Sequence, residues 1–256
     1  MEYNRTKLIE VRRKLHRFPE LSGQEYDTAR MLKQVLTSYN PDRLVEHLGG
    51  NGLAVVFEGR DEGPSVLFRC DMDALPIKET NQFEYKSTVE GVAHKCGHDG
   101  HMAIMLGLAE AIFYDPPARG RIILLFQPSE ENGQGALSVL GDEQFREIQP
   151  DFVFALHNLP GYPEGSLVLK EGVFAAASKG MINRLYGRTS HAGEPENGNS
   201  PALAMADIVR DLTFLPETDS FEDFTLVTVI HSKLGEVAFG RSEERRVGKE
   251  CATGCR

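Results

Sequence analysis

The chain has 256 residues, 41% of them apolar, with a formal net charge of -10 and a pI near 5.3. These values predict a globular protein with a large core, and the negative charge disfavours nucleic acid and anionic membranes as partners because it would repel both. No segment approaches the roughly 20 apolar residues that span a bilayer, and the four scattered cysteines do not suggest a disulfide framework. We therefore expect a cytoplasmic protein that acts on a small molecule.

Two helices are predicted at the start of the chain. Apolar residues recur near helical spacing over residues 6–18, and Pro19 ends this helix because proline has no amide donor. Ser22, with Glu25 three residues later, has the spacing of a capping box and predicts the start of a second helix. His16 lies near the end of the first helix, where a structural role is the more common one.

Four apolar runs predict strands, and three of them lead into acidic or metal-binding residue types. The runs are 53–57, 65–70, 121–126 and 152–156, and a further helix is predicted over 103–113. The last three runs are followed by Asp71 and Asp73, by Glu130 and Glu131, and by His157. In open α/β sheets ligands bind beyond the carboxyl ends of the strands, so we expect these side chains to converge on one cleft.

Residues 94–101 hold three imidazoles, a thiol and a carboxylate, with Gly97 between two of these donors. Thiolate and imidazole bind Zn²⁺ and similar ions, whereas carboxylates also suit harder ions such as Mn²⁺. Cys96 and His98 alone do not complete a coordination sphere. The sequence therefore predicts a metal site whose other ligands come from the strand ends.

The pattern changes after residue 180. A strand over 181–186, a helix that starts at Pro201 and a strand over 224–230 form a predicted β-α-β unit. The apolar face of this helix is expected to be buried, and its members are Met205, Ile208, Val209 and Leu212.

Taken together, these motifs resemble the M20 metallopeptidase family, in its amidohydrolase branch of hippurate hydrolases, N-acetyldiaminopimelate deacetylases and auxin-conjugate hydrolases. The segments that carry the resemblance are 15–22, 71–76, 94–101, 127–131, 155–157 and 190–193. Peptidase branches usually have His-x-Asp where this chain has Asp71-x-Asp73, which favours the amidohydrolase branch. Lys95 replaces a residue that is usually small in that branch, and we expect it to point away from the metals.

The resemblance implies an α/β fold: a zinc-peptidase-like, three-layer α/β/α catalytic domain with an inserted, here incomplete, ferredoxin-like lid. It also implies two divalent ions, zinc or manganese, with cobalt and nickel as alternatives. The metal ligands that it implies are Cys96, His98, Glu131 and His157. Glu130 resembles the general base and acid, and Asp73 a supporting acid behind the ligands. His191 resembles a lid residue that stabilises the oxyanion, in a lid that often forms a homodimer.

The implied domains are a catalytic part over 1–180 and the first half of the lid over 181–240. Residues 241–251 have no apolar face and match the translation of a common sequencing adaptor, so we expect 241–256 to be a non-native tail. A basic tail or a Cys251/Cys255 metal pair are the alternatives. The missing natural sequence is then expected to contain the rest of the lid and the last metal-binding histidine of the family.

Three functions remain open from the sequence. The first is a metal-dependent amidohydrolase that cleaves the amide bond of N-acyl amino acids with a metal-activated water. The second is a metallo-dipeptidase or aminopeptidase of the same family. The third is an inactive metal-binding fragment.

Overall fold

The computed structural model describes the chain except for residues 1–3, 173–176, 192, 223–224, 236–249 and 255–256. The chain forms two compact units, Met1–Pro163 and Glu164–Arg256, and each is described by itself. The domain boundary near residue 180 stays a prediction. Most of the predicted tail, residues 241–249 and 255–256, lies outside the described residues.

The first unit is built on a mixed five-stranded sheet with the order β1-β2-β4-β3-β5. Its strands are β1 (Arg43–Leu48), β2 (Gly52–Glu58), β3 (Asp61–Asp71), β4 (Arg119–Gln127) and β5 (Phe152–Ala155). Strands β3, β4 and β5 are parallel, whereas β2 is antiparallel to both β1 and β4. The four predicted strands are confirmed. The fifth, β1, was missed because a bulge at His47, with φ of 60°, interrupts its alternation.

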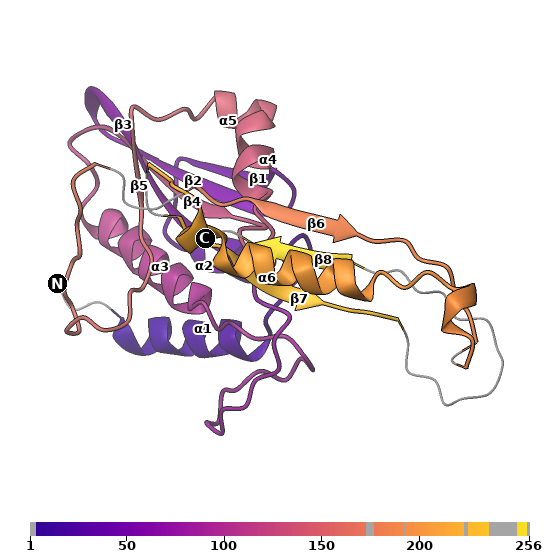
Figure 1. Cartoon of the computed structure of the whole chain (residues 1–256). Helices are drawn as coiled ribbons and strands as arrows, with labels where there is room; N and C mark the ends of the chain where they lie inside the picture. The colour runs from indigo at the N-terminus through magenta and orange to yellow at the C-terminus, as the bar shows by residue number, and fades with distance from the viewer. Residues whose placement is uncertain (1–3, 173–176, 192, 223–224, 236–249, 255–256) are drawn as a thin grey trace. The chain divides into compact units, whose positions relative to one another are not determined.

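Helices cover both faces of this sheet (Figure 1). The larger layer consists of α1 (Arg5–Arg17), α2 (Tyr26–Thr37) and α3 (His98–Tyr114), and the smaller one of α4 (Gly135–Gly141) and α5 (Glu143–Arg146). Alternate residues of β4 point to opposite layers: Leu124 and Phe126 pack in the core with α1 to α3, whereas Ile123 and Leu125 pack in the core with α4 and α5. The predicted three-layer α/β/α arrangement is confirmed.

The capping-box prediction for the second helix is wrong. Helix α2 begins at Tyr26, and its N-cap residue Glu25 makes no side-chain capping bond. The Ser22 hydroxyl donates instead to Asp73 Oδ2 at 2.6 Å, and the Glu25 side chain is fully buried. Both side chains that the local pattern assigned to the helix end therefore bind residues distant in sequence instead.

Helix α3 begins five residues before the predicted start at Ala103, so the metal-binding motif forms its first turn. Gly97 is the N-cap and has a left-handed φ of 89°, which favours glycine. A side chain at Gly97 would also lie 2.8 Å from Asn158 Oδ1. The glycine therefore permits the sharp bend between Cys96 and His98.

Strand β5 does not have the predicted burial. Phe152, Val153 and Phe154 are 56%, 62% and 54% exposed. The strand lies at the edge of the sheet and pairs with β3 alone among the described strands, which leaves its outer side uncovered.

The second unit contains a three-stranded antiparallel sheet with the order β6-β8-β7. Its elements are β6 (Gly180–Arg184), the short 3₁₀ helix η1 (Pro195–Asn197), α6 (Ala202–Thr218), β7 (Thr228–Ser232) and β8 (Glu250–Gly254). Helix α6 packs against β7, but its predicted apolar face is only half-buried, contrary to expectation. Strand β8 comes from the predicted tail, and the lid resemblance stays a prediction. In the described part of the chain, no helix is long and apolar enough to cross a membrane.

Candidate metal centre

The candidate site lies where the parallel strands of the first unit end. Asp71 is the last residue of β3 and pairs in register with Gln127, the last residue of β4. His157 follows two residues after the end of β5. Because parallel strands end at the same edge, these segments meet the N-terminal turn of α3 there.

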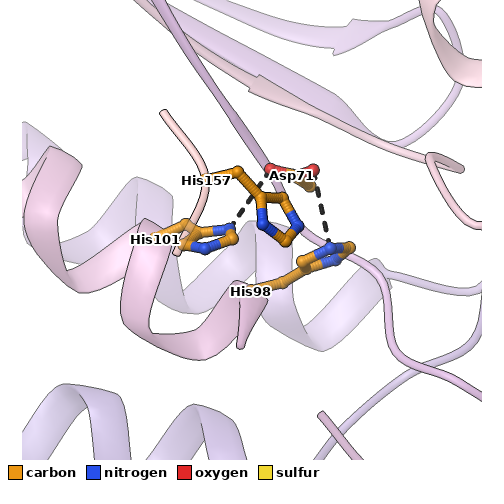
Figure 2. A group of neighbouring side chains, drawn as sticks. All are labelled: Asp71, His98, His101 and His157. Carbon is orange, nitrogen blue, oxygen red and sulfur yellow. Dashed lines mark ion pairs between the residues drawn. The ribbon is translucent and has the colours of Figure 1, made fainter. Parts of the chain in front are cut away.

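Four side chains form the first group of metal-type donors (Figure 2). They are Asp71, His98, His101 and His157, whose donor atoms all lie within 4.8 Å of one another. Asp71 Oδ2 is 3.5 Å from His98 Nε2, and Asp71 Oδ1 is 3.5 Å from His101 Nδ1. The first three side chains are buried and His157 is exposed, so the group opens toward solvent at His157.

A second donor group shares His98 with the first. Cys96, His98 and Glu131 also have donor atoms within 4.8 Å of one another. His98 Nε2 is 3.7 Å from Glu131 Oε1 and 3.9 Å from Glu130 Oε2. Together the two groups hold six donor side chains, enough for two adjacent cations, and the single free lone pair of His98 can bind one of them.

Backbone contacts orient two of the imidazoles as ligands. His98 Nδ1 lies 2.8 Å from the Asp73 carbonyl oxygen, and His157 Nδ1 lies 2.9 Å from the Asn158 carbonyl oxygen. A carbonyl only accepts, so each Nδ1 carries the hydrogen and leaves the Nε2 lone pair available to a metal. Burial alone would lower the pKa of His98, but the carboxylates of Asp73 and Asp71 raise it, and the field that favours a proton there also favours a metal cation.

Several buried polar atoms at the site have no hydrogen-bond partner among the described residues. Those in the donor groups are Asp71 Oδ1, His98 Nε2, His101 Nδ1 and Glu131 Oε1, while Asp71 Oδ2 also lacks a hydrogen bond but is 3.2 Å from Arg69 Nη1. Buried polar atoms without partners are costly in free energy, and a cation would satisfy them. The donor types and these unpaired atoms therefore fit a divalent metal centre.

The two neighbouring glutamates have different environments. The Glu131 side chain is 11% exposed and its N–H donates to Asp73 Oδ2 at 2.9 Å, whereas the Glu130 side chain is 38% exposed. Ser129, immediately before them, has a left-handed φ of 53°, so the chain turns directly after β4 instead of continuing as an extended strand. Burial and the nearby carboxylates of Asp71 and Glu131 raise the pKa of Glu130.

Asp73 belongs to neither donor group. Its side chain accepts a hydrogen bond from the Glu131 N–H and lies close to the Nδ1 side of the His98 ring. Burial would raise its pKa, but the nearby His98 ring and hydrogen bonds from the Ser22 hydroxyl and the Glu131 backbone hold the pKa of Asp73 at about 2. Its charge is therefore maintained at neutral pH. Asp73 Oδ1 lies 3.7 Å from His98 Nδ1, a position that suits the supporting role implied by the resemblance.

The structure brings the predicted ligands Cys96, His98 and Glu131 together and places His157 with His98 in the other group. Asp71 and His101 belong to segments that the sequence marked as donor-rich, but the ligand set implied by the resemblance left both residues out. Their spacing was an available signal: Asp71 shares a strand face with Asp73, and His101 follows His98 by three helical residues. His191 lies in the second unit, where it is exposed and its Nδ1 accepts from the Gly193 N–H at 3.1 Å, so its catalytic role stays a prediction.

A buried ion network supports the metal-binding motif from α1. His16 Nδ1 lies 3.1 Å from Asp99 Oδ2, and His16 Nε2 lies 3.0 Å from Glu79 Oε2. Both ring nitrogens face acceptors, so the imidazole donates twice and is cationic. Lys95 Nζ is 2.6 Å from Glu79 Oε1, which directs this side chain to Glu79.

We expect folding stability to fall as pH rises through the pKa of His16. The hydrogen bond to Asp99 raises this pKa against the effect of burial, while burial lowers the pKa of the neighbouring His94 to about 4 and keeps it neutral. Because the folded pKa of His16 exceeds the unfolded value of about 6.5, its stabilisation is complete below that pH and is lost above the folded pKa. Denaturant unfolding of the wild type and His16→Gln should give a stability difference that shrinks with rising pH. A pH-independent difference would contradict this assignment.

Comparison with known proteins identifies the family. The family model for peptidase family M20/M25/M40 matches residues 67–250. N-acetyldiaminopimelate deacetylase of Priestia megaterium is 35% identical over 240 residues, which cover 93% of this chain and 64% of that protein. N-acetyl-L-cysteine deacetylase of Bacillus subtilis is 37% identical over 203 residues, which cover 79% of this chain and 48% of that protein.

A solved Bacillus subtilis structure, described as a dinuclear metal-binding peptidase of the M20 family, has a TM-score of 0.69 and 26% identity, covering 98% of this chain and 63% of that one. The chain therefore belongs to peptidase family M20/M25/M40, as its motifs indicated. It spans between about half and two thirds of the length of these relatives.

Proposed function

We propose that this protein is a metal-dependent amidohydrolase that cleaves the amide bond of N-acyl amino acids. The observation that carries the proposal is the pair of donor groups sharing His98, with the carboxylate of Glu130 beside them and outside both groups. The two deacetylase relatives, which are named for N-acetyl amino acid substrates, support the substrate class.

The proposed metal ligands are Cys96, His98, Glu131 and His157, and the geometry adds Asp71 and His101 as candidates. Imidazole, thiolate and carboxylate together suit zinc or manganese, with cobalt and nickel as alternatives. Two divalent ions, when bound, would polarise the substrate carbonyl and lower the pKa of the attacking water.

Glu130 is the proposed general base and acid. Its raised pKa suits a group that takes a proton from water and then gives it to the leaving amine nitrogen. Asp73 holds the His98 ring and the Glu131 backbone in place. His191 is proposed to stabilise the oxyanion, and the second unit is proposed to form a homodimer contact.

The test is hydrolysis by metal-free and metal-loaded protein. We expect the chelator-treated protein to be inactive, and we expect added Zn²⁺ or Mn²⁺ to restore cleavage of N-acetyl and N-benzoyl amino acids. Metal binding should also raise the melting temperature, because ions that bind only the folded state stabilise it. Cleavage of free dipeptides but not of acyl amino acids would favour a metallo-dipeptidase, and metal binding without turnover would favour an inactive fragment.

A further inference from the structure

Glu25 is a buried carboxylate that belongs to neither donor group. Its side chain is 0% exposed, although it lies at the N-cap of α2, where a glutamate could have remained in solvent. Glu25 Oε1 accepts from the Ser129 N–H at 2.8 Å, and Oε2 accepts from Asn51 Nδ2 at 3.1 Å. Burying a carboxylate is unfavourable unless its hydrogen bonds compensate, so the contact with Ser129 is a specific feature of the fold.

The Glu25 carboxylate accepts this hydrogen bond from a residue whose backbone conformation is unusual. Ser129 has a φ of 53°, a left-handed conformation that residues with a Cβ rarely adopt. A hydrogen bond from an amide to a carboxylate is stronger than one between neutral groups, and it can hold this conformation in place. The Gly135 N–H also donates to the Ser129 carbonyl at 2.9 Å, so both polar groups of this peptide position are satisfied.

The other end of the same turn is held from the same segment of the chain. Glu131 N–H donates to Asp73 Oδ2, and Ser22 Oγ donates to that same oxygen at 2.6 Å. Residues 22–25 therefore contact the turn directly through Glu25 and indirectly through Ser22 and Asp73. The turn between these two anchors carries Glu130 and Glu131.

We infer that Glu25 is a positioning residue for the metal centre: its carboxylate fixes the left-handed turn at Ser129 and thereby directs Glu131 toward His98 and Glu130 to a place beside it. The inference rests on the proposed function of the two glutamates. It explains why the capping-box pattern of Ser22 and Glu25 does not cap α2, since both side chains serve the turn and its support instead.

The experiment is a Zn²⁺ titration of the chelator-treated full chain, with amide hydrogen exchange at Ser129 as a second readout. We expect Glu25→Ala to weaken Zn²⁺ binding about 10–100-fold, the usual effect of removing a residue that supports metal ligands. The Ser129 amide should also exchange faster. Glu25→Gln should remain within a few-fold of the wild type, because its side-chain oxygen still accepts the Ser129 hydrogen bond.

Glu110→Ala is the matched control, because Glu110 is another buried carboxylate and is 5% exposed. It lies twelve residues beyond His98 on α3, about 18 Å along the helix axis, so its loss should not change Zn²⁺ affinity. If Glu25→Ala does not fold, Glu25→Asp takes its place, since the shorter side chain withdraws the carboxylate from Ser129 and keeps the charge.

Ser129→Gly gives an independent readout of the mechanism. Glycine adopts a left-handed φ without strain, so this change should recover part of the affinity lost in Glu25→Ala. Equal Zn²⁺ affinity in the wild type and Glu25→Ala would overturn this inference and leave the proposed function intact. A wild-type chain that binds neither Zn²⁺ nor Mn²⁺ would overturn both.

Discussion

Glu130→Gln is expected to lower turnover by about 10²–10⁴-fold, the usual contribution of a general base, while leaving metal binding nearly intact. Glutamine has nearly the same shape but does not accept a proton from water at neutral pH. Glu130 lies outside both donor groups, and its side chain is more exposed than that of Glu131. The substitution therefore removes the proposed proton transfer without removing a proposed ligand.

Glu131→Gln is the paired variant, and we expect it to lose metal as well as turnover. Glu131 Oε1 is buried without a hydrogen-bond partner among the described residues and lies 3.7 Å from His98 Nε2. The measurement is metal content per chain by elemental analysis, together with hydrolysis of an N-acetyl amino acid. If both variants are equally depleted of metal, the proposed division of roles between the two glutamates is wrong.

The sequence predicted the sheet, and the edge of it where the candidate metal donors gather, because those features depend on strong local signals. Unbroken apolar runs such as 121–126 form strands buried on both faces, and polar residues directly after them lie at the edge where parallel strands end. The glycine between Cys96 and His98 likewise marked a bend that few other residues could make. Each of these signals is contained within a few residues.

Features that depend on distant contacts were not predictable in the same way. Ser22 and Glu25 match the local pattern of a helix cap. In the structure they instead form hydrogen bonds with Asp73 and Ser129, which are distant in sequence. Similarly, Phe152 to Phe154 form an apolar run that reads as buried, yet their exposure depends on what covers the sheet edge. A local pattern limits the hydrogen bonds and the burial that a side chain can have. Which of them it has depends on residues that are distant in sequence.

His98→Ala is expected to have the largest effect on metal binding because His98 belongs to both donor groups. Its removal takes away one nitrogen donor that either group could use and leaves the buried carboxylate of Asp71 with one fewer cationic or metal partner. We therefore expect the metal position that His98 binds to weaken by more than the roughly 10–100-fold that loss of a supporting residue costs. The rise in melting temperature on adding Zn²⁺ should become smaller for the same reason.

Cys96→Ser and His157→Ala separate the two positions, because each removes a donor from one group only. Each should retain part of the metal content, and Cys96→Ser should also lose sensitivity to thiol reagents if its thiolate is a ligand. His231→Ala, which alters an exposed histidine of β7, is the control for losing an imidazole elsewhere. Circular dichroism of each metal-free variant distinguishes a lost ligand from a lost fold. A folded His98→Ala protein that keeps the metal content of the wild type would refute the assignment of His98 as a metal ligand.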